Sequence, residues 1–415
     1  MATEAILTTD RGEFSLPACG IIAAAAVTLV LSSGALTAGA TAFLVPLTTE
    51  FGWSHGQYSV LYMVCTYMCA AAGFFMARMA DSIGSRRVIL PVALTFPFAL
   101  MGLSLMNGSL LQGAFLFGLA GIGAATAVVY FRLTALWFHR RLGMAFAITA
   151  LTQGVLTAAY GPTVQAIFQQ IGWRSTFLVL GALYLVVAVP LQWALVREPA
   201  GHLPGKNDSR PAQATLTGAS LKEALRTPAL WIIFIIDLIA MMIGSGVRLH
   251  IVPILGAHAI DQTTAIAISY GAMLCALAVR PVFGWALDAF NTPRAVVPFA
   301  LLTILGMLAL MLGTSALLFA PALFLMNAGT ASEASSGNYF LARYFGRLHY
   351  GQIVAVIYLA TPLGIGLGPL LLGYLRDHTG GHTLGLTVMA VLSVVCLLSL
   401  FALRGYRYTA KAPSA

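Results

Sequence analysis

Residues 77–87 are Ala-Arg-Met-Ala-Asp-Ser-Ile-Gly-Ser-Arg-Arg, and residues 284–294 are Gly-Trp-Ala-Leu-Asp-Ala-Phe-Asn-Thr-Pro-Arg. The two stretches align at a shift of 207 residues, which places Asp81 opposite Asp288. A single shift that pairs several separate places indicates that the chain has two related halves. The other matches at this shift are Val45-Pro46 with Val252-Pro253, Arg87 with Arg294, Pro91 with Pro298, and Trp137-Phe138 with Tyr344-Phe345.

The composition around these stretches is that of a membrane protein. Hydrophobic residues occupy 59% of the 415 positions and charged residues only 8%, which is too much apolar surface and too little charge for a soluble protein. A spanning helix needs about 20 apolar residues, and blocks of that length recur along the chain. We therefore predict an all-α membrane protein of about twelve transmembrane helices, at residues 18–48, 56–80, 87–107, 110–137, 143–170, 173–196, 228–256, 263–287, 295–315, 318–342, 351–375 and 382–403.

The most polar stretch separates six predicted spans from the other six. The predicted organisation is a tail at 1–17, a six-helix bundle at 18–196, a linker at 197–227, a second six-helix bundle at 228–403 and a tail at 404–415. Parallel repeats of this kind are typical of alternating-access carriers, whose two pseudo-symmetric bundles enclose a substrate site near the middle of the membrane.

The basic residues predict the orientation of the chain. The formal net charge is +9, and 17 of the 22 Lys and Arg fall on the side of the predicted N-terminal tail, which the positive-inside rule assigns to the cytoplasm. We expect a multi-pass protein of the cell membrane, in the simplest case a bacterial inner membrane, with both termini cytoplasmic. The charge is thus explained by topology, and we predict no nucleic-acid partner.

The chain shows no pattern typical of an enzyme or a metal site. Its five cysteines lie in apolar stretches without the spacing of metal ligands, and we find no nucleophile or metal constellation of an embedded hydrolase. We therefore predict no catalytic residue, no cofactor and no bound metal, and a monomer as the functional unit.

Residues 77–87 resemble the signature loop of the major facilitator superfamily, Gly-x-x-x-Asp-(Arg)-x-Gly-x-Arg-Arg, with departures at Ala77 and Ser82. Residues 284–294 resemble its second copy. The Asp lies at a helix end, where it can accept hydrogen bonds from a neighbouring helix N-terminus and pair with Arg, and so hold one conformation. The expected residues of this latch are Asp81, Arg86, Arg87, Asp288 and Arg294.

Other motifs are similar to the monocarboxylate porter and oxalate/formate antiporter branches of that superfamily. They are Phe51-Gly52-Trp53-Ser54, the run from Trp137 to Ala145, His250-Ile251-Val252-Pro253, Arg280-Pro281, and Arg343-Tyr344-Phe345-Gly346. The resemblance implies that Arg280 binds a substrate carboxylate through two parallel hydrogen bonds. It does not imply proton coupling, because Ala276 stands where the animal porters have an Asp. Span eleven also lacks the Lys with which the oxalate/formate branch holds a second carboxylate, which favours a single carboxylate unless Arg248 acts as the second cation.

An ionisable side chain inside a bilayer costs several kcal/mol unless it is paired or hydrated, so each one is a candidate site. Arg280 either binds an anionic substrate or pairs with Glu333. Asp237 and Glu333 either accept protons or form structural pairs. Arg248 and His250 are about 200° apart around a helix, so an unbent helix cannot point both into one pocket. The remaining intramembrane charge is Arg132, which either snorkels or serves the site.

We predict a secondary active transporter that moves a small organic anion, in the simplest case a monocarboxylate, by proton symport or anion exchange. The alternatives are a dicarboxylate exchanger of the oxalate/formate type and a multidrug or cation exporter that uses Asp237 and Glu333. The predicted substrate-binding residues are Arg280, His250, Arg248, Tyr130, Asn338 and Tyr339, and the candidates for proton coupling are Asp237, Glu333 and His250.

Overall fold

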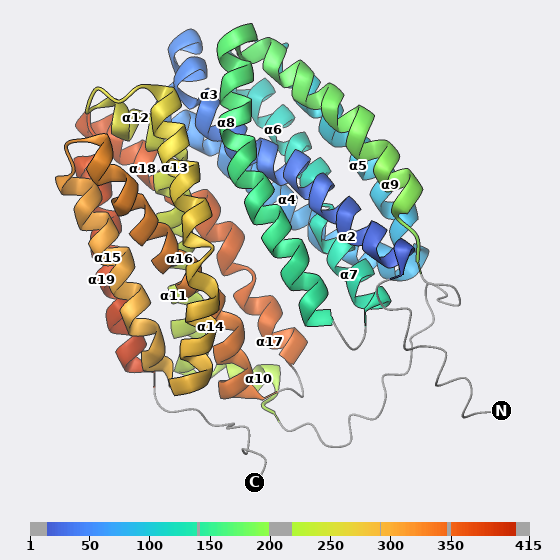
Figure 1. Ribbon diagram of the computed structural model, residues 1–415, viewed down its shortest axis with the longest axis vertical. Helices are drawn as coiled ribbons and strands as arrows, with labels where there is room; N and C mark the ends of the chain where they lie inside the picture. Colours follow the sequence, from blue (N-terminus) through green and yellow to red (C-terminus); the bar gives the residue numbers. More distant parts are fainter. Residues whose placement is uncertain (1–14, 139–141, 199–217, 291, 347–349, 404–415) are drawn as a thin grey trace. The chain divides into compact units, whose positions relative to one another are not determined.

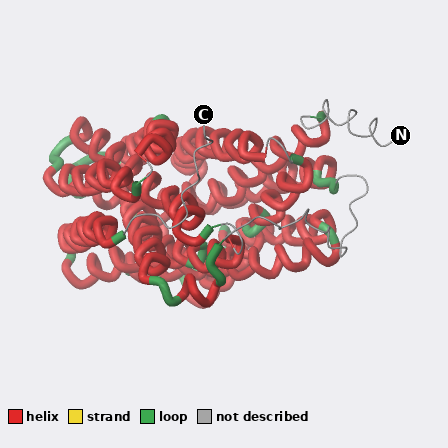
Figure 2. Tube along the Cα trace, turned by 90° about the horizontal axis from the view of Figure 1, so that it is seen from below, coloured by secondary structure: helices red, strands yellow, loops and turns green. Residues whose placement is uncertain are grey.

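The computed structural model describes residues 15–138, 142–198, 218–290, 292–346 and 350–403. The side chains of Asp81, Asp288 and Asn338, three of the predicted site residues, lie outside the described set. Figure 2 shows helix almost throughout; within the described ranges, the only β-type pairing is one isolated bridge between Gly218 and Gly346. The prediction of an all-α fold is confirmed.

The chain divides into two compact units, residues 1–53 with 60–207, and residues 54–59 with 208–415. The first turn of α4 therefore belongs to the second unit. The described helices of the first unit, including the rest of α4, are coloured blue to green in Figure 1. They are α2 (Leu16–Leu29), α3 (Ala35–Phe51), α4 (His55–Ile83), α5 (Ser85–Leu103), α6 (Leu110–Ala124), α7 (Ala127–Trp137), α8 (Leu142–Leu183) and α9 (Val189–Leu195), with π-helical turns at η1 (Val30–Gly34) and η2 (Tyr184–Ala188).

The second unit contains the helices coloured green-yellow to red in Figure 1. They are α10 (Leu221–Leu225), α11 (Pro228–Leu249), α12 (Ile251–Gly256), α13 (Gln262–Ala276), α14 (Val279–Phe290), the 3-10 turn η3 (Pro293–Val296), α15 (Val297–Leu312), α16 (Ala316–Phe345), α17 (Tyr350–Ile357), α18 (Ala360–Thr379) and α19 (Thr383–Ala402).

The described helices account for the predicted number of spans. Ten segments are long and apolar enough to cross a membrane. One of them, Leu151–Leu195, has 45 residues, which is long enough for two crossings. Gly172 adopts φ +76° inside it and interrupts α8, a backbone conformation that glycine reaches without a steric penalty. The helix α16 is not among these ten, but its 30 residues are long enough for a further crossing. The described part of the chain thus matches the prediction of about twelve.

The outward faces of these helices are apolar. Leu111, Leu312 and Leu317 are among the most exposed large side chains, and Leu317 is 84% exposed. In water such surface would be strongly unfavourable, whereas lipid tails solvate it and the helices satisfy their own backbone hydrogen bonds. The chain is a multi-pass membrane protein.

Three helix breaks in the second unit precede a proline. Proline has no N–H, and its ring clashes with the carbonyl group four residues earlier, so a helix tends to break one turn before it. The α11–α12 break at His250 precedes Pro253, the α13–α14 break precedes Pro281, and the α17–α18 break precedes Pro362. The sequence thereby places Arg280 and Thr361 next to irregular turns inside the bundle.

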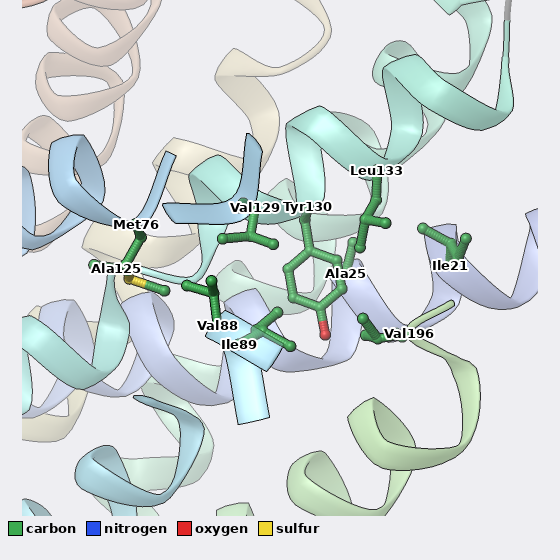
Figure 3. Packing of buried hydrophobic residues seen from close by; sticks show 12 residues of the cluster. Ile21, Ala25, Met76, Val88, Ile89, Ala125, Val129, Tyr130, Leu133 and Val196 are labelled. Atoms are coloured by element: carbon green, nitrogen blue, oxygen red, sulfur yellow. The ribbon is translucent and has the colours of Figure 1, made fainter. Parts of the chain in front are cut away.

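The core of the first unit is a buried apolar cluster formed by α2, α4, α5, α7 and the end of α9 (Figure 3). Met76, Ile89 and Val129 belong to it, and between helices in lipid such side chains stabilise the fold through van der Waals contacts rather than through transfer out of water. Tyr130 is also part of the cluster, is 1% exposed, and its hydroxyl group shares a 3.0 Å hydrogen bond with Thr28. The structure therefore places this predicted substrate ligand in the apolar packing of the first unit.

Candidate functional site

A hollow of about 350 Å³ lies inside the second unit, lined by α11, α13, α14, α16 and α18. Its walls combine small or apolar side chains with a few polar ones, which is typical of sites for small molecules. The polar residues that line it are Asp237, Ser245, Arg248, Arg280, Asn327, Thr330 and Thr361.

Arg280 lines this hollow from the first turn of α14, directly after the break that precedes Pro281. Its backbone amide donates to the Leu277 carbonyl at 3.3 Å. Among the described residues, its guanidinium group has no hydrogen-bond or ion-pair partner. A guanidinium group offers several N–H donors in a planar fork, so Arg280 presents unused donors to the hollow.

Glu333 is not the partner of Arg280. Its side chain is 1% exposed, lies beside the Thr303 hydroxyl and the Cys396 thiol, and neither carboxylate oxygen has a hydrogen-bond partner of acceptable geometry. It does not line the hollow. The alternative of an Arg280–Glu333 ion pair is therefore wrong, and a role of Glu333 in proton coupling stays a prediction.

Asp237 and Arg248 both line the hollow from α11. They are eleven residues apart, which is about three helical turns and nearly the same face. Asp237 is 5% exposed and accepts a 2.9 Å hydrogen bond from the Thr361 hydroxyl group. Arg248 lines the hollow whereas His250 does not, which agrees with the prediction that the two point in different directions.

Two further predicted ligands, His250 and Tyr339, lie elsewhere in the second unit. His250 is completely buried at the α11–α12 break, with its Nε2 atom 3.1 Å from the Pro369 carbonyl oxygen. The Tyr339 hydroxyl group donates to the Leu287 carbonyl at 2.9 Å. The side chain of Asn338 lies outside the described residues. Of the six predicted substrate-binding residues, the structure brings Arg280 and Arg248 into the hollow.

The sequence analysis did not identify three polar residues of the hollow. Thr361 binds Asp237, and its position directly before Pro362 was the available signal. Asn327 donates from Nδ2 to the Leu323 carbonyl at 2.7 Å, and Thr330 donates to the Met326 carbonyl at 2.9 Å. The Thr330 hydroxyl group thereby uses its single donor and can only accept a further strong hydrogen bond, whereas Asn327 keeps one N–H donor and its Oδ1 acceptor.

A separate polar network lies at one end of the first unit. The Glu198 carboxylate accepts hydrogen bonds from the Ser85 amide at 2.9 Å and from Arg132 at 2.7 Å. Arg132 also donates to the Ser85 hydroxyl group at 2.6 Å. Ser85 begins α5, so the carboxylate lies at the positive end of a helix dipole. Arg132 is therefore an ion-pair partner, and Glu198 is a residue that the sequence analysis missed.

The predicted latch is only partly described. Arg86 donates to the Trp193 carbonyl at 3.0 Å, and its guanidinium carbon lies 5.7 Å from the centre of the Trp193 ring. Arg87 and Arg294 are exposed. Since the side chains of both aspartates lie outside the described set, the latch stays a prediction.

We expect Glu198→Gln to destabilise the first unit by about 2 kcal/mol, the scale of a hydrogen-bonded charge. Partial burial raises the pKa of Glu198, but the hydrogen bonds from Ser85 and Arg132 outweigh it and hold the pKa below its ordinary value of 4.5. The stabilisation is therefore fully present above pH 4.5 and is lost as the pH falls through the lowered pKa. Thermal unfolding of both proteins between pH 3 and pH 7 measures it; an unchanged difference across that range would contradict the ion pair.

Comparison with known proteins decides the family. The sequence model of the Major Facilitator Superfamily matches residues 25–261 and 249–415. The chain belongs to the major facilitator superfamily. It is a membrane-embedded secondary transporter of small molecules rather than an enzyme, and the resemblance of residues 77–87 and 284–294 to the signature loop is confirmed at the level of the family.

Among curated relatives, monocarboxylate transporter 11 of Mus musculus is 30% identical over 269 residues, which cover 59% of this chain and 55% of the relative. The human protein of the same name is 29% identical over 60% of this chain. The chain thus spans about half the length of these relatives. An uncharacterized 38 kDa protein in the 23S RNA operon of Thermoproteus tenax is 23% identical over 83% of this chain and 84% of its own length.

Solved transporters share the fold at low sequence identity. A bacterial homologue of the human lysosomal transporter Spinster, inward-facing and unoccupied, has a TM-score of 0.75 and 15% identity, and the match covers 94% of this chain and 97% of that one. A variant of the nucleoside transporter NupG has a TM-score of 0.77 and 11% identity, over 93% of this chain and 99% of that one. At these identities the similarity shows the superfamily fold alone.

Proposed function

We propose that this transporter carries a small organic monocarboxylate and that Arg280 binds the carboxylate group. The observation that supports the proposal most strongly is the Arg280 guanidinium group, which lines the hollow without an acidic partner among the described residues. A planar fork of donors matches the two oxygens of a carboxylate. The relatives named monocarboxylate transporter 11 support the same substrate class.

The rest of the hollow fits the remainder of such a substrate. Met241, Met273 and Leu277 provide apolar contacts, and the oxygens of Asn327 and Thr330 can accept a hydrogen bond from a substrate hydroxyl group. Ala276 lines the hollow where the animal porters have an Asp, so the hollow has one described carboxylate, Asp237. We propose that Asp237 accepts the coupled proton.

A second candidate is a dicarboxylate exchanger, because Arg248 lines the same hollow as Arg280. Two guanidinium groups in one site can each bind one end of a short diacid. By contrast, Glu333 does not line the hollow, so no observation favours the alternative of a cation exporter that uses both acids.

Uptake by purified protein in proteoliposomes tests the proposal. Labelled lactate-like monocarboxylates, oxalate and formate are offered in turn, with and without an inward proton gradient. Saturable uptake of a monocarboxylate, competed by other monocarboxylates, supports the main proposal. Exchange of oxalate that requires Arg248 supports the second candidate, and the absence of anion flux across the whole panel contradicts both.

We expect Asp237→Asn to abolish the response of uptake to a proton gradient while anion exchange continues. An amide keeps the hydrogen bond from Thr361, which is 2.9 Å long, but has no titratable proton. The measurement compares the initial rate of uptake at an internal pH of about 7.5 and an external pH of about 6 with the rate of exchange at equal pH. Thr361→Val is the matched control, because it removes the hydrogen bond and keeps the carboxylate. Gradient-driven uptake by the Asn variant would exclude Asp237 as the proton acceptor.

A further inference from the structure

Three histidines of the second unit form a cluster outside the hollow. His55 begins α4 in the segment 54–59, His250 occupies the α11–α12 break, and His382 directly precedes α19. His55 and His250 are 6% and 0% exposed, and His382 is half-buried. The three residues are far apart in the sequence, so no metal-ligand motif in the sequence predicts the cluster.

The rings face one another closely. The centres of the His55 and His250 rings are 5.6 Å apart and their planes differ by 21°. The His382 ring centre lies 6.0 Å from His55 and 5.8 Å from His250. One nitrogen of each ring lies within 4.8 Å of one nitrogen of both others.

Each ring also has a buried nitrogen without a hydrogen-bond partner. These atoms are His55 Nδ1, His250 Nδ1 and His382 Nε2. Buried polar atoms are paired in the great majority of cases, so three unpaired nitrogens in one cluster call for a ligand. Among the described residues, none of these three nitrogen atoms has a hydrogen-bond partner.

The surroundings of His250 select the tautomer that a metal ion requires. Its Nε2 atom lies 3.1 Å from the Pro369 carbonyl oxygen, which can only accept a hydrogen bond. Nε2 is also 3.2 Å from the Ser59 oxygen, while the Ser59 hydroxyl group donates to the His55 carbonyl at 2.8 Å. Both contacts therefore require a proton on Nε2, which leaves a lone pair on Nδ1. Histidines that bind a metal ion through one ring nitrogen usually donate the N–H of the other to a group such as a backbone carbonyl, which fixes the tautomer and the orientation of the ring.

Asp377 holds His55 in place. Its two carboxylate oxygens accept hydrogen bonds from the backbone amides of His55 at 3.0 Å and Gly56 at 2.7 Å, at the start of α4. The Arg376 guanidinium group lies 4.0 Å from the same carboxylate. The backbone that carries the His55 ring is thus fixed from outside the cluster, and the ring itself is left to bind a ligand.

We propose that His55 Nδ1, His250 Nδ1 and His382 Nε2 bind a divalent transition metal ion of the Zn²⁺ type. Three neutral imidazoles with a fourth position open to water form a common tetrahedral zinc site, with Zn–N distances of about 2.0–2.1 Å. Such distances place the nitrogens about 3.4 Å apart, whereas one nitrogen of each ring now lies within 4.8 Å of the others, so metal binding requires the rings to move closer together. The ion ties the first turn of α4 to the α11–α12 break and to the start of α19.

Metal binding by the full-length protein, purified without a polyhistidine tag and stripped with a chelator, tests this proposal. With free Zn²⁺ buffered near 1 µM, we expect the wild-type protein in detergent to bind one more equivalent of Zn²⁺ than His382→Gln. The affinity of the variant for Zn²⁺ is expected to fall by about 100-fold or more, because changes to residues that only support a metal ligand already cost about 10–100-fold. His382 is half-buried, so this variant keeps the packed core. Co²⁺ gives an independent signal, because tetrahedral nitrogen coordination produces visible absorption that His382→Gln and His55→Gln lose.

The control is His258→Gln, which removes an exposed histidine outside the cluster and is expected to bind Zn²⁺ as the wild type does. Helical circular dichroism and gel filtration verify that each variant is folded. Equal Zn²⁺ stoichiometry in wild type, His382→Gln and His55→Gln, or a wild-type dissociation constant above about 100 µM with no Co²⁺ absorption, overturns the proposal. None of these readouts depends on transport, so they are independent of the proposed substrate.

Discussion

Arg280→Ala is expected to lower carboxylate uptake at least 100-fold while the protein remains folded. Removing one partner of a desolvated charge pair costs about 3 kcal/mol or more, and each 1.4 kcal/mol corresponds to about a factor of ten in affinity. Arg280 has no hydrogen-bond or ion-pair partner among the described residues, so truncation breaks no interaction of that kind. The loss should therefore appear in transport and leave stability almost unchanged.

Arg280→Lys separates charge from geometry. Lysine keeps the positive charge but replaces the planar fork with a single ammonium group, so we expect uptake between that of the wild type and that of the Ala variant. Arg226→Ala is the matched control, because Arg226 is exposed after α10 and does not line the hollow. Initial uptake rates below saturation and thermal unfolding are measured for all four proteins. Wild-type uptake by Arg280→Ala would remove Arg280 from the substrate site.

The sequence predicted those parts of the site that follow from depth and helical periodicity. Arg280 lies eight residues before Asp288, which is about 12 Å along a helix and was enough to predict an intramembrane cation. The helix break before Pro281 was not predicted, because the predicted span at residues 263–287 is continuous. The separation of Asp237 and Arg248 by eleven residues was enough to place them on one face. The divergence of Arg248 and His250 follows from the same geometry.

Other parts of the site depend on how each helix is rotated about its axis, which hydropathy does not determine. Glu333 is buried, but it packs beside Thr303 and Cys396 and does not line the hollow. Tyr130 is likewise buried in the core of the first unit.

Partners that lie far apart in the sequence form a second class of features that no local pattern predicts. Glu198 binds Ser85 across 113 positions, and the cluster of His55, His250 and His382 joins three distant helix ends. The sequence identifies each of these residues as polar, but only the folded chain brings them together.

Gly368→Ala is expected to destabilise the protein strongly, because α11 and α18 are in backbone contact at this residue. A Cβ atom on Gly368 would lie 2.1 Å from the Met242 carbonyl oxygen, and one on Gly364 would lie 2.6 Å from the Leu238 carbonyl oxygen. Small residues permit such close approach of membrane helices. Since the added methyl group meets backbone rather than a flexible side chain, the helices must separate, and we expect a loss of about 3 kcal/mol or more, at the upper end of overpacking costs.

The separation should also reach the site, because α18 carries Thr361 and α11 carries its partner Asp237, 2.9 Å away. We therefore expect Gly368→Ala to give little monodisperse protein and a strongly lowered unfolding temperature in detergent. Gly271→Ala is the matched control: a Cβ atom there meets nothing within 4 Å, and alanine favours a helix over glycine by about 0.5–1 kcal/mol. If the two variants unfold at the same temperature, α11 and α18 are not packed backbone to backbone, and the hollow that they line must have a different shape.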